Sequence, residues 1–392
     1  MKLRKLALVL HRYIGITVGI LLIAICLTGS LLVFGNEIDR FLNPQLLQVV
    51  PQPERVSLEY VVNRVNSVYP NLKIESIDIP QNPTAVYRVW SESKDKQVVF
   101  VYVNPYNGSI LGSRLKEKTL MNFLVELHIN FLAGEIGSVV VGICGMLLLV
   151  LCVSGLVLWT GWQKFMQGFK IRWKAPSKLL NYDIHKVLGM LSVAFLLLIV
   201  STGVAMSFFS QFEQAVYALT STSLPVVPTK SNPAADRQTL PVDRILENAN
   251  QALPVAQTIW VNIPADSTGL YRVGKRFSQD TSLSSASSDS QIYVDQYTGK
   301  VWRVNTAHKG PLATKIVYSL YPLHIGSYGG LGMRIIYVLV GLAPTGLFIT
   351  GFVLWRHRQW SIARRQAAMK VTQKTKRYPE EDYFWVNEWP WF

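Results

Sequence analysis

The chain has 392 residues, of which 49% are hydrophobic, and its 39 basic residues outnumber 24 acidic ones to give a formal net charge of +15. A positive mean hydropathy over this length is atypical of soluble proteins, and it predicts that apolar residues are concentrated in membrane-spanning segments. The three cysteines all lie in apolar stretches and no Cys-x-x-Cys-His motif is present. These features exclude a disulfide framework, a cysteine-based zinc site and covalent c-type haem attachment.

Four stretches of more than 20 residues contain no Asp, Glu, Lys, Arg or His: Tyr13–Phe34, Ile136–Thr160, Val187–Phe209 and Ile335–Trp355. At a rise of about 1.5 Å per residue, each can cross a hydrocarbon core of about 30 Å as a helix. The first stretch could instead be a signal peptide, but its apolar run is too long and no Ala-x-Ala site ends it. We therefore predict four transmembrane helices.

Basic residues collect in three segments: residues 1–12, the loop 161–186 and the tail from residue 356. These segments hold 18 of the 39 basic residues but only 5 of the 24 acidic ones. Because an excess of Lys and Arg marks the cytoplasmic side of a membrane, both termini are predicted to be cytoplasmic. The segments 35–135 and 210–334 then face outward. This explanation of the charge is favoured over nucleic-acid binding.

These observations predict the following organisation, in chain order. The first half has a transmembrane helix with a cytoplasmic N-terminus in 1–35, an outer domain in 36–125 and a second transmembrane helix in 126–160, followed by a basic cytoplasmic loop in 161–184. The second half has a third transmembrane helix in 185–210, a second outer domain in 211–320, a fourth transmembrane helix in 321–356 and a cytoplasmic tail in 357–392.

The sequence repeats itself. His11–Gly15 aligns with His185–Gly189 at an offset of 174, which also places Thr28-Gly29 on Thr202-Gly203. An offset of 196 aligns Gly155–Trp159 with Gly351–Trp355. The pattern predicts two tandem copies of one unit, each a helix, an outer domain and a helix, in the same orientation about an axis along the membrane normal.

Each outer domain is predicted to be a small α/β unit, because one stretch has helical spacing and three have strand-like alternation. In the first copy these are a helix over Ser57–Tyr69 and strands over Lys73–Ile79, Val86–Trp90 and Val98–Val103. In the second copy they are a helix over Val242–Ala252 and strands over Ala256–Ile263, Tyr271–Lys275 and Gln291–Val294. Residues 278–290 are predicted to be a mobile hairpin tip and 224–239 a linker.

Four of the six histidines occupy equivalent positions in the two repeats. His11 and His185 lie at the cytoplasmic ends of the first and third helices, and His128 and His324 lie just outside the second and fourth. If the two halves pack face to face, His11 meets His185 and His128 meets His324. Two neutral imidazoles from separate helices can supply both axial ligands of a haem iron, which favours electron transfer over oxygen chemistry. The alternative, an interfacial hydrogen-bonding histidine, does not require this recurrence in register.

Glycines and basic residues accompany these histidines. Arg12, Lys186 and Arg334 could pair with haem propionates, whereas His308 is predicted to be a surface or core residue. His357 lies in a basic turn and would replace His11 or His185 as a ligand if either failed. Glycines that could leave room for a flat macrocycle are Gly15, Gly19, Gly29, Gly189 and Gly203 in the first and third helices, and Gly134, Gly137, Gly142, Gly326, Gly329, Gly330 and Gly332 near the second and fourth.

Several stretches resemble PepSY-associated transmembrane proteins, the group of iron-regulated membrane proteins that includes inner-membrane ferric-siderophore reductases. They are His11–Gly15 with Leu27–Ser30, Glu126–His128 with Gly134–Gly137 and Ser154–Trp159, and His185-Lys186 with Gly189. The resemblance implies two periplasmic PepSY-like domains and, for the reductase members, two b-type haems. The stretch Ala343–Gly346 departs from the pattern, and Pro344 is predicted to kink the fourth helix.

The expected protein is a bacterial inner-membrane dihaem carrier with bis-histidine haem b at two sites. It would reduce a periplasmic ferric siderophore or other ferric chelate with electrons from a cytoplasmic donor or the quinone pool. The alternative is a non-enzymatic membrane anchor whose outer domains bind or restrain a periplasmic partner such as a peptidase. A transporter is disfavoured because the four spans contain no Asp, Glu, Lys or Arg.

Overall fold

The computed structural model of the protein describes residues 2–224, 230–231, 238–277, 290–306 and 310–377, with side chains up to residue 370. The chain forms two compact units. The first unit comprises Met1–Ile20, Val150–Val193 and Ala343–Phe392, and the second comprises Leu21–Leu149 and Ala194–Leu342. His308, residues 378–392 of the predicted tail, most of the predicted linker 224–239 and all but residue 290 of the predicted hairpin tip lie outside the described residues.

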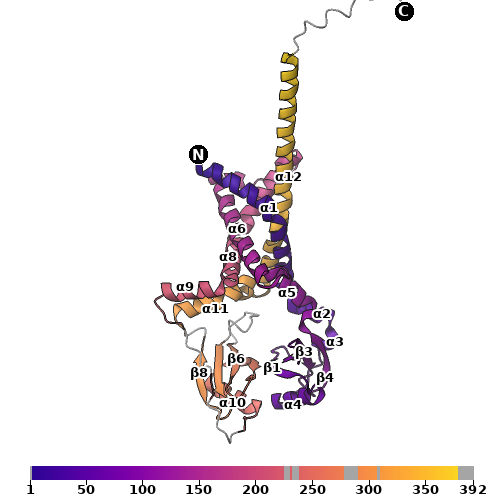
Figure 1. Ribbon diagram of the computed structural model, residues 1–392, viewed down its shortest axis with the longest axis vertical. Coiled ribbons are helices and arrows are strands. Elements are labelled where there is room, and N and C mark those ends of the chain that lie inside the picture. Colours follow the sequence, from indigo (N-terminus) through magenta and orange to yellow (C-terminus); the bar gives the residue numbers. More distant parts are fainter. Residues whose placement is uncertain (1, 225–229, 232–237, 278–289, 307–309, 378–392) are drawn as a thin grey trace, which may run out of the picture. The chain divides into compact units, whose positions relative to one another are not determined.

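Four helices are long and apolar enough to cross a membrane, which confirms the predicted spans. They are α1 (Lys2–Leu32), α6 (Gly134–Leu158), α8 (Ser177–Ser207) and α12 (Gly330–Arg377). Three of them extend beyond the apolar stretches, because the flanking Lys- and Arg-rich segments also favour helix. α12 is one long helix in Figure 1, and it continues without interruption through Pro344.

The second and fourth spans are each preceded by a separate helix, α5 (Leu120–Asn130) and α11 (Leu312–Ile325). α5 ends where Phe131 and Leu132 both adopt left-handed backbone conformations, with φ of 52° and 62°. α11 ends at Gly326, whose φ of 71° is the usual way to close a helix. His128 and His324 therefore lie on these separate helices rather than on the spans themselves.

Short helices complete the connections. α9 (Phe209–Leu219) packs along α11 through Val216 and Val317 and lies beside it in Figure 1. The remaining helices are α2 (Gly35–Leu42), α3 (Pro44–Leu47) and α7 (Phe165–Gly168), with 3-10 turns at Lys116–Lys118, Thr160–Trp162 and Ser327–Gly329.

Eight strands form one antiparallel sheet in the order β4-β3-β2-β1-β5-β6-β7-β8. The first four strands are β1 (Lys73–Asp78), β2 (Tyr87–Glu92), β3 (Val98–Val103) and β4 (Ile110–Leu115). The second four are β5 (Ala256–Asn262), β6 (Leu270–Phe277), β7 (Ser290–Asp295) and β8 (Val301–Asn305). Six of these strands match the predicted ones within a few residues. The edge strands β4 and β8 were not predicted, because neither has a strict alternation of apolar and polar residues.

One apolar core lies between this sheet and two helices, α4 (Leu58–Val68) and α10 (Val242–Ala252). Both helices cover the same face of the sheet. The pairing of β1 with β5, with Ile77 opposite Val261, places residues from both outer segments in that core. The sequence predicts two small domains, and the structure joins their strands edge to edge. This pairing satisfies backbone groups that two separate sheets would leave exposed at an edge.

Each half also caps the helix of the other half. The Asp243 carboxylate of α10 accepts hydrogen bonds from the backbone N–H groups of Leu58 (2.9 Å) and Glu59 (3.2 Å) at the start of α4. In return, the Glu59 carboxylate accepts from the N–H of Val242 at the start of α10 (2.8 Å). The first N–H groups of a helix have no partner within the helix, so these exchanged contacts fasten the two halves together.

Replacing Asp243 with Ala should destabilise the β1–β5 junction by about 1–2 kcal/mol, because two N–H groups of α4 lose their acceptor. We expect faster hydrogen–deuterium exchange of β1 and β5 amides in the full-length protein. The control is Glu247→Ala, also on α10, whose ion pair with Arg244 is exposed and should matter by less than about 0.5 kcal/mol. Equal exchange in the two variants would contradict the capping role.

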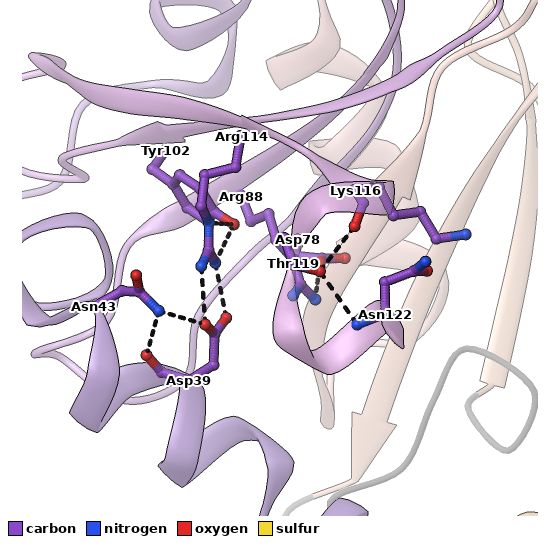
Figure 2. A network of polar contacts seen from close by, with 9 residues as sticks. All are labelled: Asp39, Asn43, Asp78, Arg88, Tyr102, Arg114, Lys116, Thr119 and Asn122. Carbon is purple, nitrogen blue, oxygen red and sulfur yellow. Dashed lines mark hydrogen bonds and ion pairs between the residues drawn. The ribbon is translucent and has the colours of Figure 1, made fainter. Parts of the chain in front are cut away.

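A polar network connects α2 to the strands β3 and β4, as Figure 2 shows. Arg114 donates two parallel hydrogen bonds to the Asp39 carboxylate, at 2.9 and 2.8 Å, and another to the Tyr102 hydroxyl. Asn43 donates to the same carboxylate at 2.8 Å. The bonds to Asp39 raise the pKa of Arg114 above its usual value. Since α2 directly follows α1, this network fixes the sheet to the end of a membrane span.

Replacing Arg114 with Ala should destabilise this attachment by about 2–4 kcal/mol, because the largely buried Asp39 carboxylate loses its counter-charge. The measurement is hydrogen–deuterium exchange of β3 and β4 amides in the full-length protein. Arg88→Gln provides the control, since the Arg88–Asp78 pair in the same view is about a third exposed and should contribute at most about 1 kcal/mol. A smaller effect for Arg114 than for Arg88 would refute the assignment.

Candidate functional site: two histidine pairs

The structure brings the four repeated histidines together as two pairs. In the first unit, His11 of α1 faces His185 of α8, with ring centroids 6.0 Å apart and ring planes at 84°. In the second unit, His128 of α5 faces His324 of α11, with ring centroids 6.1 Å apart and ring planes at 51°. Each pair takes one histidine from each half of the sequence, as the repeat predicts.

A hydroxyl group lies within hydrogen-bond distance of the Nδ1 atom of every histidine in these pairs. The distances are 2.9 Å from His11 to Ser154, 2.9 Å from His185 to Thr350, 3.3 Å from His128 to Thr28 and 3.2 Å from His324 to Thr202. Three Nδ1 atoms also face a backbone carbonyl: Leu151 for His11 at 3.1 Å, Ile25 for His128 at 2.8 Å and Ile199 for His324 at 2.9 Å. Each ring is therefore oriented by a span of its own half.

These contacts determine the tautomer of each ring. A carbonyl oxygen can only accept, so the Nδ1 atoms of His11, His128 and His324 must carry the hydrogen. For His185, the Thr350 hydroxyl already donates to the carbonyl of Gly346 at 2.7 Å, so it accepts from Nδ1. In all four neutral rings the lone pair then lies on Nε2. A ring nitrogen held in this way by a hydrogen bond on the other nitrogen is the usual form of a metal-bound histidine.

A glycine follows each of the four hydroxyl residues and makes room for the ring. A Cβ atom at Gly29 would lie 2.8 Å from Cε1 of His128, and one at Gly203 would lie 2.9 Å from Cε1 of His324. The corresponding distances are 3.4 Å from Gly155 to His11 and 3.4 Å from Gly351 to His185. We call Ser154-Gly155, Thr350-Gly351, Thr28-Gly29 and Thr202-Gly203 the hydroxyl–glycine pairs. In each, the hydroxyl orients an imidazole and the glycine leaves space for it.

The spacing of the rings in each pair is close to what a shared iron would require. A bond from a metal to an imidazole nitrogen is about 2.0–2.1 Å, and this nitrogen lies about 1.1 Å from the ring centroid, so two imidazoles on opposite sides of one metal have centroids about 6.2–6.4 Å apart. The observed 6.0 and 6.1 Å lie within a few tenths of an ångström of this range. Ring rotation about the metal–nitrogen bond does not change the distance, so both interplanar angles are compatible.

The donor set also fits haem better than a bare ion. Among the described residues, no three His, Cys, Asp or Glu side chains cluster closely enough to hold a metal. Each site therefore offers two imidazoles and nothing further. A porphyrin supplies four nitrogen ligands of its own and needs only two axial ones from the protein.

The three basic residues predicted to pair with propionates have different surroundings. Lys186 donates to Asp183 (3.4 Å) and to the backbone carbonyls of the adjoining loop. Arg334 makes two bonds to the Glu37 carboxylate, at 2.7 and 2.8 Å, and these lower the pKa of Glu37. Arg12, which is half-buried, forms no hydrogen bond or ion pair within the part of the chain that the structure describes. Arg12 is thus the candidate whose donors are available to an anionic group.

Other residues singled out in the sequence have partners of several kinds. His357 packs edge-on against Trp360 in α12, at 5.8 Å between ring centroids. The space beside Gly19 is occupied by the ring of Phe348, and the space beside Gly142 by the ring of Phe208. These two glycines therefore accommodate aromatic packing rather than a macrocycle. Gly29 and Gly203 serve the imidazoles.

Comparison with known proteins gives one clear result. The model of a protein family described as the PepSY-associated TM region matches residues 8–358, which is nearly the whole chain. The match includes all four paired histidines and all four hydroxyl–glycine pairs. No curated protein matches the sequence.

Proposed function

Because the chain belongs to the family of proteins with a PepSY-associated TM region and has four candidate membrane-spanning helices, we propose that it is a membrane electron carrier with two bis-histidine haem b sites. Its proposed substrate is a periplasmic ferric chelate, such as a ferric siderophore. The observation that supports this most directly is the spacing of the two histidine pairs, 6.0 and 6.1 Å between ring centroids.

The proposed residue roles follow from the geometry. His11 and His185 would hold one haem, and His128 and His324 the other. When bound, each haem supplies an iron that accepts and releases one electron at a time. The hydroxyl–glycine pairs hold each imidazole in one orientation, so little rearrangement of the ligands would accompany a change of charge. Because each pair would supply two imidazoles to the iron, the arrangement would favour electron transfer over oxygen chemistry.

Reduction of a ferric chelate is a chemically sensible outcome for such a carrier. Hard oxygen ligands hold Fe(III) tightly, whereas Fe(II) has a lower charge and is softer, so its complexes release the metal more readily. A single electron delivered at the membrane surface therefore frees the iron.

The proposed orientation places both termini in the cytoplasm of a bacterium and the sheet in the periplasm, supported by the basic residues at 1–12, 161–186 and 356–377. Electrons would come from a cytoplasmic donor or from quinol. We further infer that the chain is a tandem duplication. Support comes from the element order of one helix, four strands and one helix, which occurs twice, in α4 to α5 and in α10 to α11.

The test uses the full-length protein purified in detergent from haem-replete cells. We expect a reduced-minus-oxidised spectrum with a sharp α band and about two b-type haems per chain. After anaerobic reduction and removal of the reductant, addition of a ferric chelate should reoxidise the haem and produce Fe(II), which a ferrous-specific chelator captures. A colourless preparation would refute the electron-carrier proposal and leave the membrane-anchor alternative. Haem that ferric chelates cannot reoxidise would refute only the substrate.

A further inference from the structure

The loop between α6 and α8 is packed around its own aromatic cluster. The Trp159 side chain is buried at its centre, and the rings of Trp162, Phe165 and Phe169 pack edge-on around it at 5.2, 5.8 and 5.5 Å. Glycines at 161 and 168 leave room for the indole, because a Cβ atom at either position would overlap it. This aromatic cluster gives the loop a defined shape in the first unit.

A buried carboxylate fastens the other end of the loop to α8. Asp183, which is 1% exposed, accepts hydrogen bonds from the backbone N–H and the guanidinium of Arg172 and also pairs with Lys186. Asp183 is the only acidic residue among the described residues of the first unit, which contain 18 basic ones. Its charge is already neutralised by these partners. The loop therefore presents almost exclusively positive charge.

Large apolar side chains are exposed on the same loop. Trp162 is 65% exposed, Phe165 62%, Met166 79% and Trp173 71%. Lys164, Lys170 and Lys174 alternate with them and are also exposed. We call these seven residues the loop surface. Membrane orientation requires only the positive charges, so it does not explain why four apolar side chains are held out into solvent.

From this combination we propose that the loop surface binds the anionic phospholipid headgroups of the leaflet at which α6 ends and α8 begins. Aromatic and Met side chains would enter the boundary between headgroups and acyl chains, while the lysine ammonium groups pair with phosphates. Charge complementarity supports this occupant, and so does position: α6 ends at Leu158, immediately before the loop, and α8 begins at Ser177, immediately after it. An acidic protein would match the charge, but the position of the loop directly between the ends of two candidate spans favours the lipid headgroups. The proposal is independent of haem binding.

The test compares the full-length protein in nanodiscs of phosphatidylcholine alone with nanodiscs that also contain phosphatidylglycerol. Competition between the two lipids for delipidated protein gives the preference for the anionic lipid. Lys164→Gln/Lys170→Gln/Lys174→Gln should reduce this preference at least tenfold. Trp162→Ser/Phe165→Ser/Met166→Ser should reduce the affinity for both lipids. The matched control removes three charges from the cytoplasmic end of α12, by Arg364→Gln/Arg365→Gln/Lys370→Gln, and should leave the preference within about twofold.

Fluorescence gives a second measurement that does not depend on the stability of the triple variants. The difference between the wild type and Trp162→Phe reports on this one indole, which brominated phosphatidylglycerol should quench and aqueous acrylamide should not. Equal loss of preference in the loop and α12 variants would overturn the proposal, because net charge alone would then be sufficient. Quenching of Trp162 by acrylamide alone would also overturn it. Binding of polyglutamate to the loop with phosphatidylglycerol present would reassign the surface to an acidic protein.

Discussion

Replacing His185 with Ala should reduce the haem content of the purified protein from about two per chain to about one. The remaining imidazole of its pair, His11, would be left as a single axial ligand with its Nδ1 still bonded to Ser154. Because the second pair lies in the other unit and takes no residue from the first, its haem should remain. The spectrum of His185→Ala should therefore be that of His128 and His324 alone. The measurement is pyridine haemochrome content per chain, together with the reduced-minus-oxidised spectrum.

His128→Ala is the complementary variant and should retain the other haem, so the two spectra should sum to that of the wild type. His357→Ala is the matched control, because this histidine also lies on a helix but belongs to neither pair and packs edge-on against Trp360. It should keep both haems. If His357→Ala lost a haem and His185→Ala did not, His357 would have to replace His185 in the ligand set. Loss of both haems in each single variant would show that the two sites depend on each other.

The histidine pairs were predictable because the evidence for them is in the register of the sequence. The repeat matches His11 with His185 at an offset of 174 and His128 with His324 at an offset of 196, so the two pairs follow once the halves pack face to face. The hydroxyl–glycine pairs were visible only in part. Thr28-Gly29 and Thr202-Gly203 align, as do Gly155 and Gly351, but their contacts with histidines depend on which helix faces which ring. That information resides in packing and not in periodicity.

The joining of the two outer segments illustrates another limit of sequence reasoning. Lys73–Asp78 and Ala256–Asn262 each have the composition of a strand, but nothing in either stretch states that its partner lies more than 180 residues away. The exchanged caps have the same character. Asp243 in the first turn of α10 is favourable for its own helix, and its contact with the N-terminus of α4 follows only once the strands have paired.

The basic residues show that a sequence can locate a charged group near a site without showing which group it binds. Arg12, Lys186 and Arg334 were grouped because each is near a paired histidine or at the end of a span. The structure gives them different partners, since Lys186 pairs with Asp183 and donates to carbonyls of the loop between α6 and α8, whereas Arg334 binds Glu37. A carboxylate three residues from Lys186 was visible in the sequence. The Arg334–Glu37 pair bridges residues that are 297 positions apart, and no local pattern could have shown it.

The glycines of the hydroxyl–glycine pairs lead to a graded prediction. Gly29→Ala and Gly203→Ala should displace His128 and His324, because the added methyl would lie 2.8 and 2.9 Å from a rigid ring carbon. Each variant should lose most of the haem of the second pair and retain that of the first. Gly155→Ala and Gly351→Ala should be much milder, since 3.4 Å is close to an ordinary contact. All four changes improve helix propensity by up to about 1 kcal/mol, so general unfolding cannot explain a selective loss.

The control for this series is Gly332→Ala in α12, where no atom would lie within 4 Å of the new methyl. Haem content and the low-spin ferric signal in electron paramagnetic resonance should be measured for all five variants. The signal matters because a small rotation of an imidazole changes it even when the haem stays bound. Equal haem loss in Gly155→Ala and Gly29→Ala would show that proximity to the imidazoles does not set the effect, and that the glycines serve helix packing instead.

Thr28→Val should act on the His128 ring in a different way. The space beside the ring is kept, but the hydroxyl that accepts from Nδ1 of His128 is removed, leaving only the Ile25 carbonyl as acceptor. The variant should therefore retain haem and shift the resonance signal of the second pair alone.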